Sequence, residues 1–185
     1  ELEQEVEKRT QELEALNQRL EHLATTDGLT GVYNRRSFEE RARQEVARAE
    51  REGEPLSLVI MDLDHFKWIN DRHGHAVGDE VLKDFVATVA ELLRRNEPLF
   101  SVGGGEFVVL MPGMDRQAGR RVADRIRTAV AQAAVPTSAG DVNYTVSIGV
   151  AEHRVGDPCE TLLRRADEHL YAAKHGGRNQ VMAGN

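Results

Sequence analysis

Residues 56–67 read LSLVIMDLDHFK, an apolar run that ends abruptly in two acidic residues, Asp62 and Asp64. The run predicts a buried strand over residues 56–61. Because α/β folds place their ligands beyond the carboxyl ends of such strands, we expect the two carboxylates to lie at a ligand site.

A second stretch, LFSVGGGEFVVLM at residues 99–111, carries three consecutive glycines between two β-rich runs. Glycine supplies the positive φ angles that tight turns demand. The stretch therefore predicts a β-hairpin whose tip holds Gly103, Gly104, Gly105 and Glu106.

Helical and strand patterns alternate along the rest of the chain. They predict helices over residues 37–51, 66–70, 79–95, 115–133 and 161–174, and further strands over 143–150 and 180–182. We expect Ser37 and Glu40 to form a capping box at the first of these helices, and a loop to hold Gly74 and Gly78. Hairpins mixed with crossover helices predict an α/β (α+β) fold, a mixed sheet flanked by helices.

Residues 1–25 form a charged helical segment without glycine or proline. Its apolar positions follow a heptad pattern, with Val6, Leu13 and Leu20 at a and Leu2, Arg9, Leu16 and Leu23 at d. So narrow a stripe favours a dimeric coiled coil over a single amphipathic helix lying on its own domain. Arg9 would weaken the seam, and we hypothesise that this allows the helix to shift register. The helix should break at 25–28, which separates a signalling helix (1–25) from a second domain (26–185).

The composition sets limits on partners and compartment. With 185 residues and a net charge of −7, the chain offers no basic stripe for nucleic acid, although a few placed cations would suffice for a nucleotide. A single cysteine, Cys159, excludes an internal disulfide and fits a reducing cytoplasm. No apolar run reaches the roughly 18 residues of a membrane helix, so we expect no membrane contact. The chain opens in mid-helix, and we expect any sensor or anchor to lie upstream.

Several separated motifs resemble, in the right order, those of the GGDEF family, the diguanylate cyclases. They are DGLTGVYNRR at 27–36, DLDHFKWIND at 62–71 with Gly74-His75 and Gly78-Asp79 after it, and YAAKHGGRN at 171–179. The resemblance covers residues 27–182 and implies a five-stranded central sheet, like the palm of nucleotidyl cyclases and polymerases. One position departs from the family, because the hairpin reads GGGEF and Gly105 stands where the family carries Asp or Glu.

Carboxylates at a strand end are hard oxygen ligands that suit Mg²⁺ (or Mn²⁺) bound to a triphosphate. The resemblance implies that Asp62, the Leu63 carbonyl and Glu106 hold this metal. For Asp64 a role as N-cap of the next helical turn is an equal alternative.

The phosphates have several candidate partners. Backbone N–H groups at His65 and Phe66 open a short helix, and Lys67 could reach the same phosphates, although alone it reads as a surface lysine. Lys174 and Arg178, taken alone, are charges that favour a helix C-terminus. The resemblance makes them phosphate contacts, with the glycines at 176–177 turning Arg178 inward.

Asn70 and Asp79 are the candidates for base recognition. An amide and a carboxylate can pair with the Watson–Crick edge of guanine, although both residues could also be caps or turn formers. The resemblance implies the guanine role, and therefore GTP. Histidines at 73 and 75 match no zinc spacing, and we expect Trp68 to serve packing.

Gly105 removes a carboxylate from the expected catalytic positions, which are Lys67, Gly105 and Glu106. Water can fill a vacant coordination site but does not replace the charge, so we expect a rate loss on the order of 10²–10³. Glu106 could partly substitute.

The family's product-inhibition motif, Arg-x-x-Asp, is matched here only by Arg94 and Glu97. The glutamate side chain is one methylene longer than the aspartate of the motif, and an arginine-rich helix end explains Arg94 equally well. Ser101 also replaces the family's usual arginine.

These observations lead to two hypotheses. In the first, a Mg-dependent homodimer held by residues 1–25 condenses two GTP into cyclic di-GMP, weakly because of Gly105. In the second, the domain is an inactive GTP-binding or dimerising regulator. A third, an aspartyl-phosphate phosphatase built on Asp62 and Asp64, does not fit the His65-Phe66-Lys67 that follows.

Overall fold

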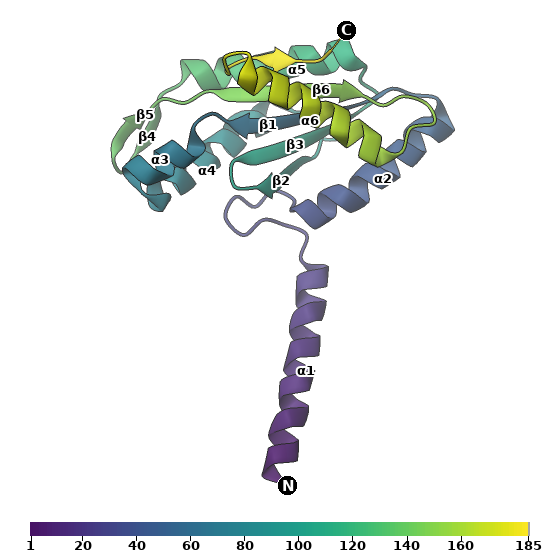
Figure 1. Ribbon diagram of the computed structural model, residues 1–185, viewed down its shortest axis with the longest axis vertical. Coiled ribbons are helices and arrows are strands. Elements are labelled where there is room, and N and C mark those ends of the chain that lie inside the picture. Colours follow the sequence, from purple (N-terminus) through teal and green to yellow (C-terminus); the bar gives the residue numbers. More distant parts are fainter. Residues whose placement is uncertain (185) are drawn as a thin grey trace.

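The computed structural model describes residues 1–184, apart from the side chains of residues 21–23, and shows a central sheet between two layers of helices (Figure 1). The helices are α1 (Leu2–Leu23), α2 (Arg35–Glu52), α3 (Phe66–His73), α4 (His75–Leu92), α5 (Arg116–Gln132) and α6 (Cys159–His175). The strands are β1 (Leu56–Leu63), β2 (Leu99–Gly103), β3 (Glu106–Pro112), β4 (Val135–Thr137), β5 (Gly140–Val142), β6 (Val146–Glu152) and β7 (Val181–Met182). No helix in this part of the chain is long and apolar enough to cross a membrane.

The main sheet has five strands in the order β2-β3-β1-β6-β7. The first four strands are antiparallel to their neighbours, and β7 runs parallel to β6. The predicted five-stranded mixed sheet is therefore confirmed, with the apolar run that ends in Asp62 at its centre. The short β4–β5 hairpin was not predicted, because three-residue strands leave little periodicity to read.

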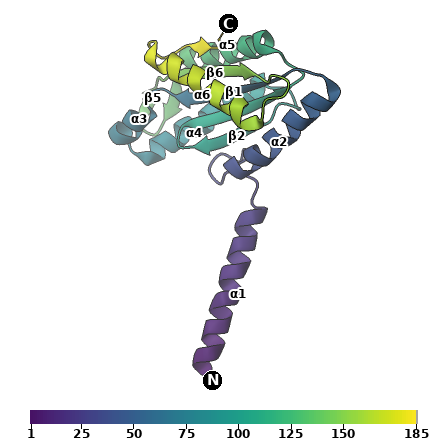
Figure 2. The ribbon, with the colours of Figure 1, turned by 45° about the vertical axis from the view of Figure 1, so that its right-hand side comes forward.

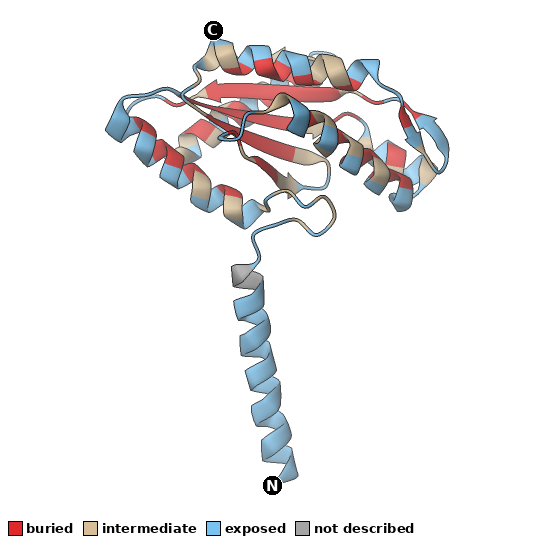
Figure 3. Ribbon diagram, turned by 180° about the vertical axis from the view of Figure 1, so that it is seen from behind, coloured by how far each residue is buried: buried red, intermediate tan, exposed pale blue. Residues whose placement is uncertain are grey.

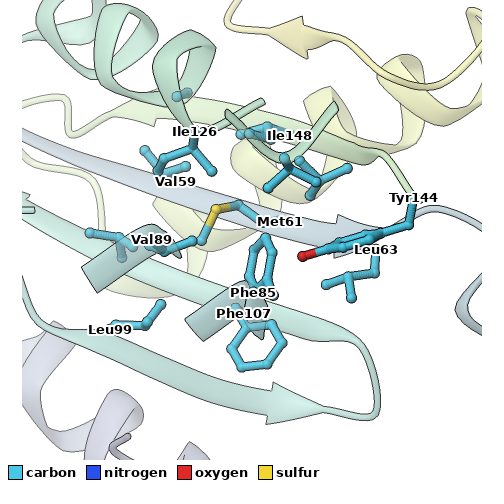
Figure 4. Packing of buried hydrophobic residues seen from close by; sticks show 14 of the residues in the cluster. Val59, Met61, Leu63, Phe85, Val89, Leu99, Phe107, Ile126, Tyr144 and Ile148 are labelled. Atoms are coloured by element: carbon cyan, nitrogen blue, oxygen red, sulfur yellow. The ribbon is translucent and has the colours of Figure 1, made fainter. Parts of the chain in front are cut away.

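Alternate residues of β1 enter two separate cores, as the two-residue period of a strand requires. Leu56, Leu58 and Ile60 pack under α2 and α6, whereas Val59 and Met61 pack with α4 and α5. Figure 4 shows the second core, in which Phe85 of α4 and Phe107 of β3 lie with their ring centroids 5.1 Å apart and their planes tilted by 44°. The strands β1, β3 and β6 are buried along most of their length, while each covering helix keeps an exposed face (Figure 3).

α1 projects from the domain as a straight helix (Figures 1 and 2). Its apolar seam residues are exposed, from 50% at Leu16 to 77% at Leu2. The alternative in which this helix lies on its own domain is therefore wrong for the seam residues described. The d position at residue 23 falls outside the described side chains.

Helix boundaries differ from prediction where another segment supplies the cap. α2 begins at Arg35, because the Asn34 side chain accepts a hydrogen bond from the Ser37 N–H at 3.0 Å. The predicted capping box of Ser37 and Glu40 is wrong, and the Ser37 hydroxyl instead donates to the Thr25 carbonyl at 2.8 Å.

The region between β1 and β2 is more helical than predicted. α3 extends to His73 and α4 begins at His75, so Gly78 lies in a helix rather than in a loop. A Cβ atom on Gly78 would lie 1.8 Å from Oδ1 of Asn70. The glycine therefore serves the close approach of α3 and α4.

Candidate functional site

Two carboxylates face each other at the tip of the sheet. Asp62 of β1 is the direct register partner of Glu106 of β3, and both fall on the face covered by α6. Lys174 of α6 forms an ion pair with Asp62. Burial, followed by repulsion from the carboxylates of Asp62 and Asp167, raises the pKa of Glu106 above the usual glutamate range. The tip thus concentrates negative charge that a cation would relieve.

These donors fit a divalent cation that shares its ligands with a substrate. Among the side chains that the structure describes, no three His, Cys, Asp or Glu residues gather to form a complete metal cage. Mg²⁺ is commonly held by one or two carboxylates together with phosphates and waters, which matches the pair of Asp62 and Glu106.

Asp64 does not cap the helix that follows it. Its side chain is 5% exposed and accepts hydrogen bonds from Thr145 Oγ1 at 2.6 Å, Ser147 Oγ at 2.7 Å and the Asn179 N–H at 3.0 Å. The N-cap position of α3 is occupied by His65, at φ 56°, without a side-chain cap. The cap interpretation of Asp64 is therefore wrong, and both of its oxygens are already engaged.

The hairpin tip rests on Phe66. A Cβ atom on Gly105 would lie 3.2 Å from the Phe66 ring, and one on Gly78 would lie 3.4 Å from its far edge. The Gly105 carbonyl accepts a hydrogen bond from the Leu63 N–H at 3.0 Å. Sequence reasoning missed this arrangement, in which one aromatic ring lies between two glycines from separate motifs.

α3 and α4 bring the candidate base-recognition residues together. Oδ1 of Asn70 is buried, and among the residues described it has no hydrogen-bond partner. Asp79 is exposed and directly follows Gly78, against which Asn70 lies. Lys67 is exposed one turn before Asn70 on α3. A buried acceptor without a partner needs an explanation, and a ligand that donates hydrogen bonds supplies one.

The turn after α6 places the remaining phosphate candidates. The Arg178 N–H donates to the Ala173 carbonyl at 3.0 Å, and Arg178 and Asn179 have φ angles of 63° and 48°. Arg178 is exposed, whereas Lys174, one helical turn earlier, reaches Asp62.

Two predicted side chains lie elsewhere than expected. Glu97 is buried, and its side chain turns back to accept a hydrogen bond from the Arg94 N–H at 2.6 Å, so it stabilises the turn that follows α4. Trp68 is 56% exposed, and the packing role expected for it is wrong. The Arg72 guanidinium lies 5.8 Å from its ring centroid.

Comparisons with known proteins show the family of this chain. The family model described as "Diguanylate cyclase, GGDEF domain" matches residues 24–180. Diguanylate cyclase DgcP of Pseudomonas aeruginosa is 40% identical over 158 residues, and response regulator PleD of Caulobacter vibrioides is 43% identical over 173. These matches cover 85% and 90% of this chain but only 24% and 38% of the two relatives.

A solved structure of similar extent also exists. The coiled coil and GGDEF domain of DgcB from Caulobacter crescentus, in complex with c-di-GMP, aligns with a TM-score of 0.84 at 33% identity. The alignment covers 99% of both chains. From its matched motifs, its sheet and these relatives, the chain belongs to the GGDEF family of diguanylate cyclase domains.

Proposed function

We propose that this domain condenses two molecules of GTP into cyclic di-GMP and releases two pyrophosphates. The observation that carries the proposal is the pair of opposed carboxylates, Asp62 and Glu106, with Lys174 beside them. The unpartnered Oδ1 of Asn70 supports a base that donates hydrogen bonds, as guanine does.

Each site residue would act by binding and orientation. Asn70 and Asp79 would hold the guanine edge, while the N–H groups of His65 and Phe66, with Lys67 and Arg178, would hold phosphates. Asp62, Glu106 and the Leu63 carbonyl would hold Mg²⁺ or Mn²⁺, which neutralises phosphate charge when bound. Lys174 would exchange its contact with Asp62 for a phosphate oxygen. Such positioning supplies much of the rate acceleration in reactions that need little covalent chemistry from the protein.

The reaction needs two copies of the domain, because each would hold one GTP and the two sites must face each other across a two-fold axis. The exposed seam of α1 would supply this dimer as a coiled coil, with residues 1–25 acting as the signalling helix. We place the activity in the cytoplasm. A product-binding site at Arg94 and Glu97 would require the Glu97 side chain to leave its hydrogen bond with the Arg94 N–H and turn outward.

A second candidate is a GTP-binding regulator without turnover. Gly105 favours it, because the hairpin tip lacks the carboxylate that the family places there. The exposed positions of Lys67, Asp79 and Arg178 would then still serve nucleotide binding.

The deciding experiment incubates the protein with GTP and Mg²⁺ or Mn²⁺ and separates the products by chromatography, beside the Gly105→Asp and Gly105→Ala variants. Alanine is the matched control, because it adds the same contact with Phe66 without the charge. Cyclic di-GMP from the unaltered protein supports the enzyme, with a further gain on the order of 10²–10³ in the Asp variant only. Product from the Asp variant alone supports the regulator. Failure of every variant to bind GTP or to form product would refute both.

A further inference from the structure

Asp64 joins three segments that are far apart in the chain. Its carboxylate, at the end of β1, receives hydrogen bonds from Thr145 and Ser147, which precede and begin β6. It also receives the backbone N–H of Asn179, 115 residues away, from the turn that follows α6. A single buried side chain therefore links residues 176–180, here called the clamp turn, to the end of β1, while the Gln180 carbonyl at the end of the turn accepts the Ile148 N–H of β6 at 3.0 Å.

The clamp turn needs such a support. Arg178 and Asn179 are consecutive residues in the left-handed region, at φ 63° and 48°, and neither is a glycine. L-residues rarely adopt this conformation, and it persists where the surroundings over-determine it. Asn179 is held through its backbone and its side chain, because its N–H donates to Asp64 and its side-chain Oδ1 accepts a hydrogen bond from Arg127 of α5 at 3.3 Å.

The hydrogen bonds within the turn connect it only to the end of α6. The Arg178 N–H donates to the Ala173 carbonyl, and Gln180 Nε2 donates to the same carbonyl at 2.8 Å. These bonds close the end of α6 on itself. The bond from Asn179 to Asp64 is the one that ties the turn to β1, two residues beyond Asp62.

Three donors converge on Asp64, and this explains why the residue is a carboxylate. An ionised carboxylate only accepts hydrogen bonds, so all three donors are satisfied without rearrangement. An asparagine offers one acceptor oxygen, which could serve Thr145 and Asn179 while its amide donates to Ser147. Such a variant would keep most of the geometry, whereas an alanine would release the turn.

We propose that Asp64 is a positioning residue that holds the clamp turn in its left-handed conformation, so that Arg178 faces the phosphates of the nucleotide. This proposal rests on the proposed function for the role of Arg178, although the hold of Asp64 on the turn does not depend on any ligand.

The test measures GTP affinity by calorimetry, with Ca²⁺ in place of Mg²⁺ to suppress turnover, for Asp64→Ala, Asp64→Asn, Arg178→Ala and the double variant Asp64→Ala/Arg178→Ala. We expect Asp64→Ala to weaken binding about tenfold or more, and Asp64→Asn to recover most of that loss. If Asp64 acts through Arg178, the double variant binds no more weakly than Arg178→Ala. Losses that simply add would overturn the proposal.

Amide hydrogen exchange separates this proposal from the proposed function. The Asn179 amide should exchange at least tenfold faster in Asp64→Ala than in the unaltered protein or in Asp115→Ala. Asp115→Ala is the matched control, since Asp115 accepts the Ala118 N–H at 2.8 Å as the cap of α5, away from the turn. Unchanged exchange at Asn179 in Asp64→Ala refutes the proposal that Asp64 holds the turn, even if the protein binds GTP. If exchange is faster in Asp64→Ala but the unaltered protein does not bind GTP, the proposed function and the role given to Arg178 are refuted, whereas the hold of Asp64 on the turn stands. Thr145→Val, which removes one donor, provides the same readout should Asp64→Ala fail to fold.

Discussion

Asp62 of β1 and Glu106 of β3 are direct partners across an antiparallel strand pair, with both carboxylates on the α6 face of the sheet. Like charges at directly opposed positions destabilise a strand pair. The site therefore carries a cost in stability that the ion pair between Asp62 and Lys174 offsets in part and that a bound metal ion would reduce further. This cost makes the arrangement measurable in the absence of any substrate.

Replacing Glu106 by glutamine should stabilise the metal-free protein at neutral pH. The raised pKa means that the folded protein binds this proton more tightly than the unfolded chain. The penalty of the ionised group therefore grows as the pH rises above the ordinary glutamate value of about 4.3, and it is absent below that value. We expect Glu106→Gln to unfold about 2 °C higher at pH 7.5 with chelator present, and at an unchanged temperature near pH 4.

Thermal unfolding followed by circular dichroism measures this difference. Glu91→Gln, an exposed position on α4, is the control for losing one negative charge. A lower unfolding temperature for Glu106→Gln at pH 7.5 would contradict the idea that burial and repulsion make the ionised Glu106 destabilising.

Lys174 should couple the metal to the nucleotide. Its ammonium neutralises Asp62 when no cation is bound, and a bound cation would free it to meet a phosphate. Lys174→Met should therefore weaken GTP binding in Mg²⁺ by about 10- to 100-fold, the scale of one charge-assisted hydrogen bond. Affinity for Mn²⁺ alone should not fall, because the competitor for Asp62 has gone. Calorimetry with each ligand tests both statements, with exposed Lys83→Met as control; a parallel loss of both affinities would contradict them.

Gly78→Ala should remove base selectivity while the fold survives. The added methyl would lie 1.8 Å from Oδ1 of Asn70, so the Asn70 side chain must leave its position. Alanine in a helix is favoured over glycine by about 1 kcal/mol, which offsets part of the steric cost. We expect the preference for GTP over ATP to fall to the level of Asn70→Ala, with an unfolding temperature within a few degrees of the unaltered protein. Competition between the two nucleotides in a binding assay measures this ratio, and a retained preference would show that Asn70 does not read the base.

The strands of the main sheet and the β2–β3 hairpin were predictable because their signals are local. The apolar run before Asp62 and the glycines at 103–105 each carry their structure within a dozen residues. Helix starts were less predictable, because Asn34 supplies the cap that Ser37 had been expected to supply. The role of Asp64 could not be read from the sequence, since its partners lie 81 to 115 residues away.

In the candidate site, too, local sequence signals were predictable and contacts between distant segments were not. The family resemblance brought Asp62 and Glu106 into one hypothesis, but their direct opposition depends on the register between β1 and β3. Trp68 looked like a core residue by type, yet it lies on the exposed side of α3, whose buried residue is Ile69, and only the assembled fold reveals this.

Filling the seam of α1 should strengthen the dimer. Arg9 occupies a d position between exposed leucines and valine, and its ion pair with Glu5 at 3.3 Å is exposed and contributes little. A leucine buried there would add about 1.5–3 kcal/mol per chain on association. We expect Arg9→Leu to lower the dimer dissociation constant by at least tenfold in sedimentation equilibrium. Lys8→Leu adds the same side chain outside the seam and is the control. An equal effect of the two variants would indicate nonspecific association, and no effect of either would argue that α1 does not form the dimer.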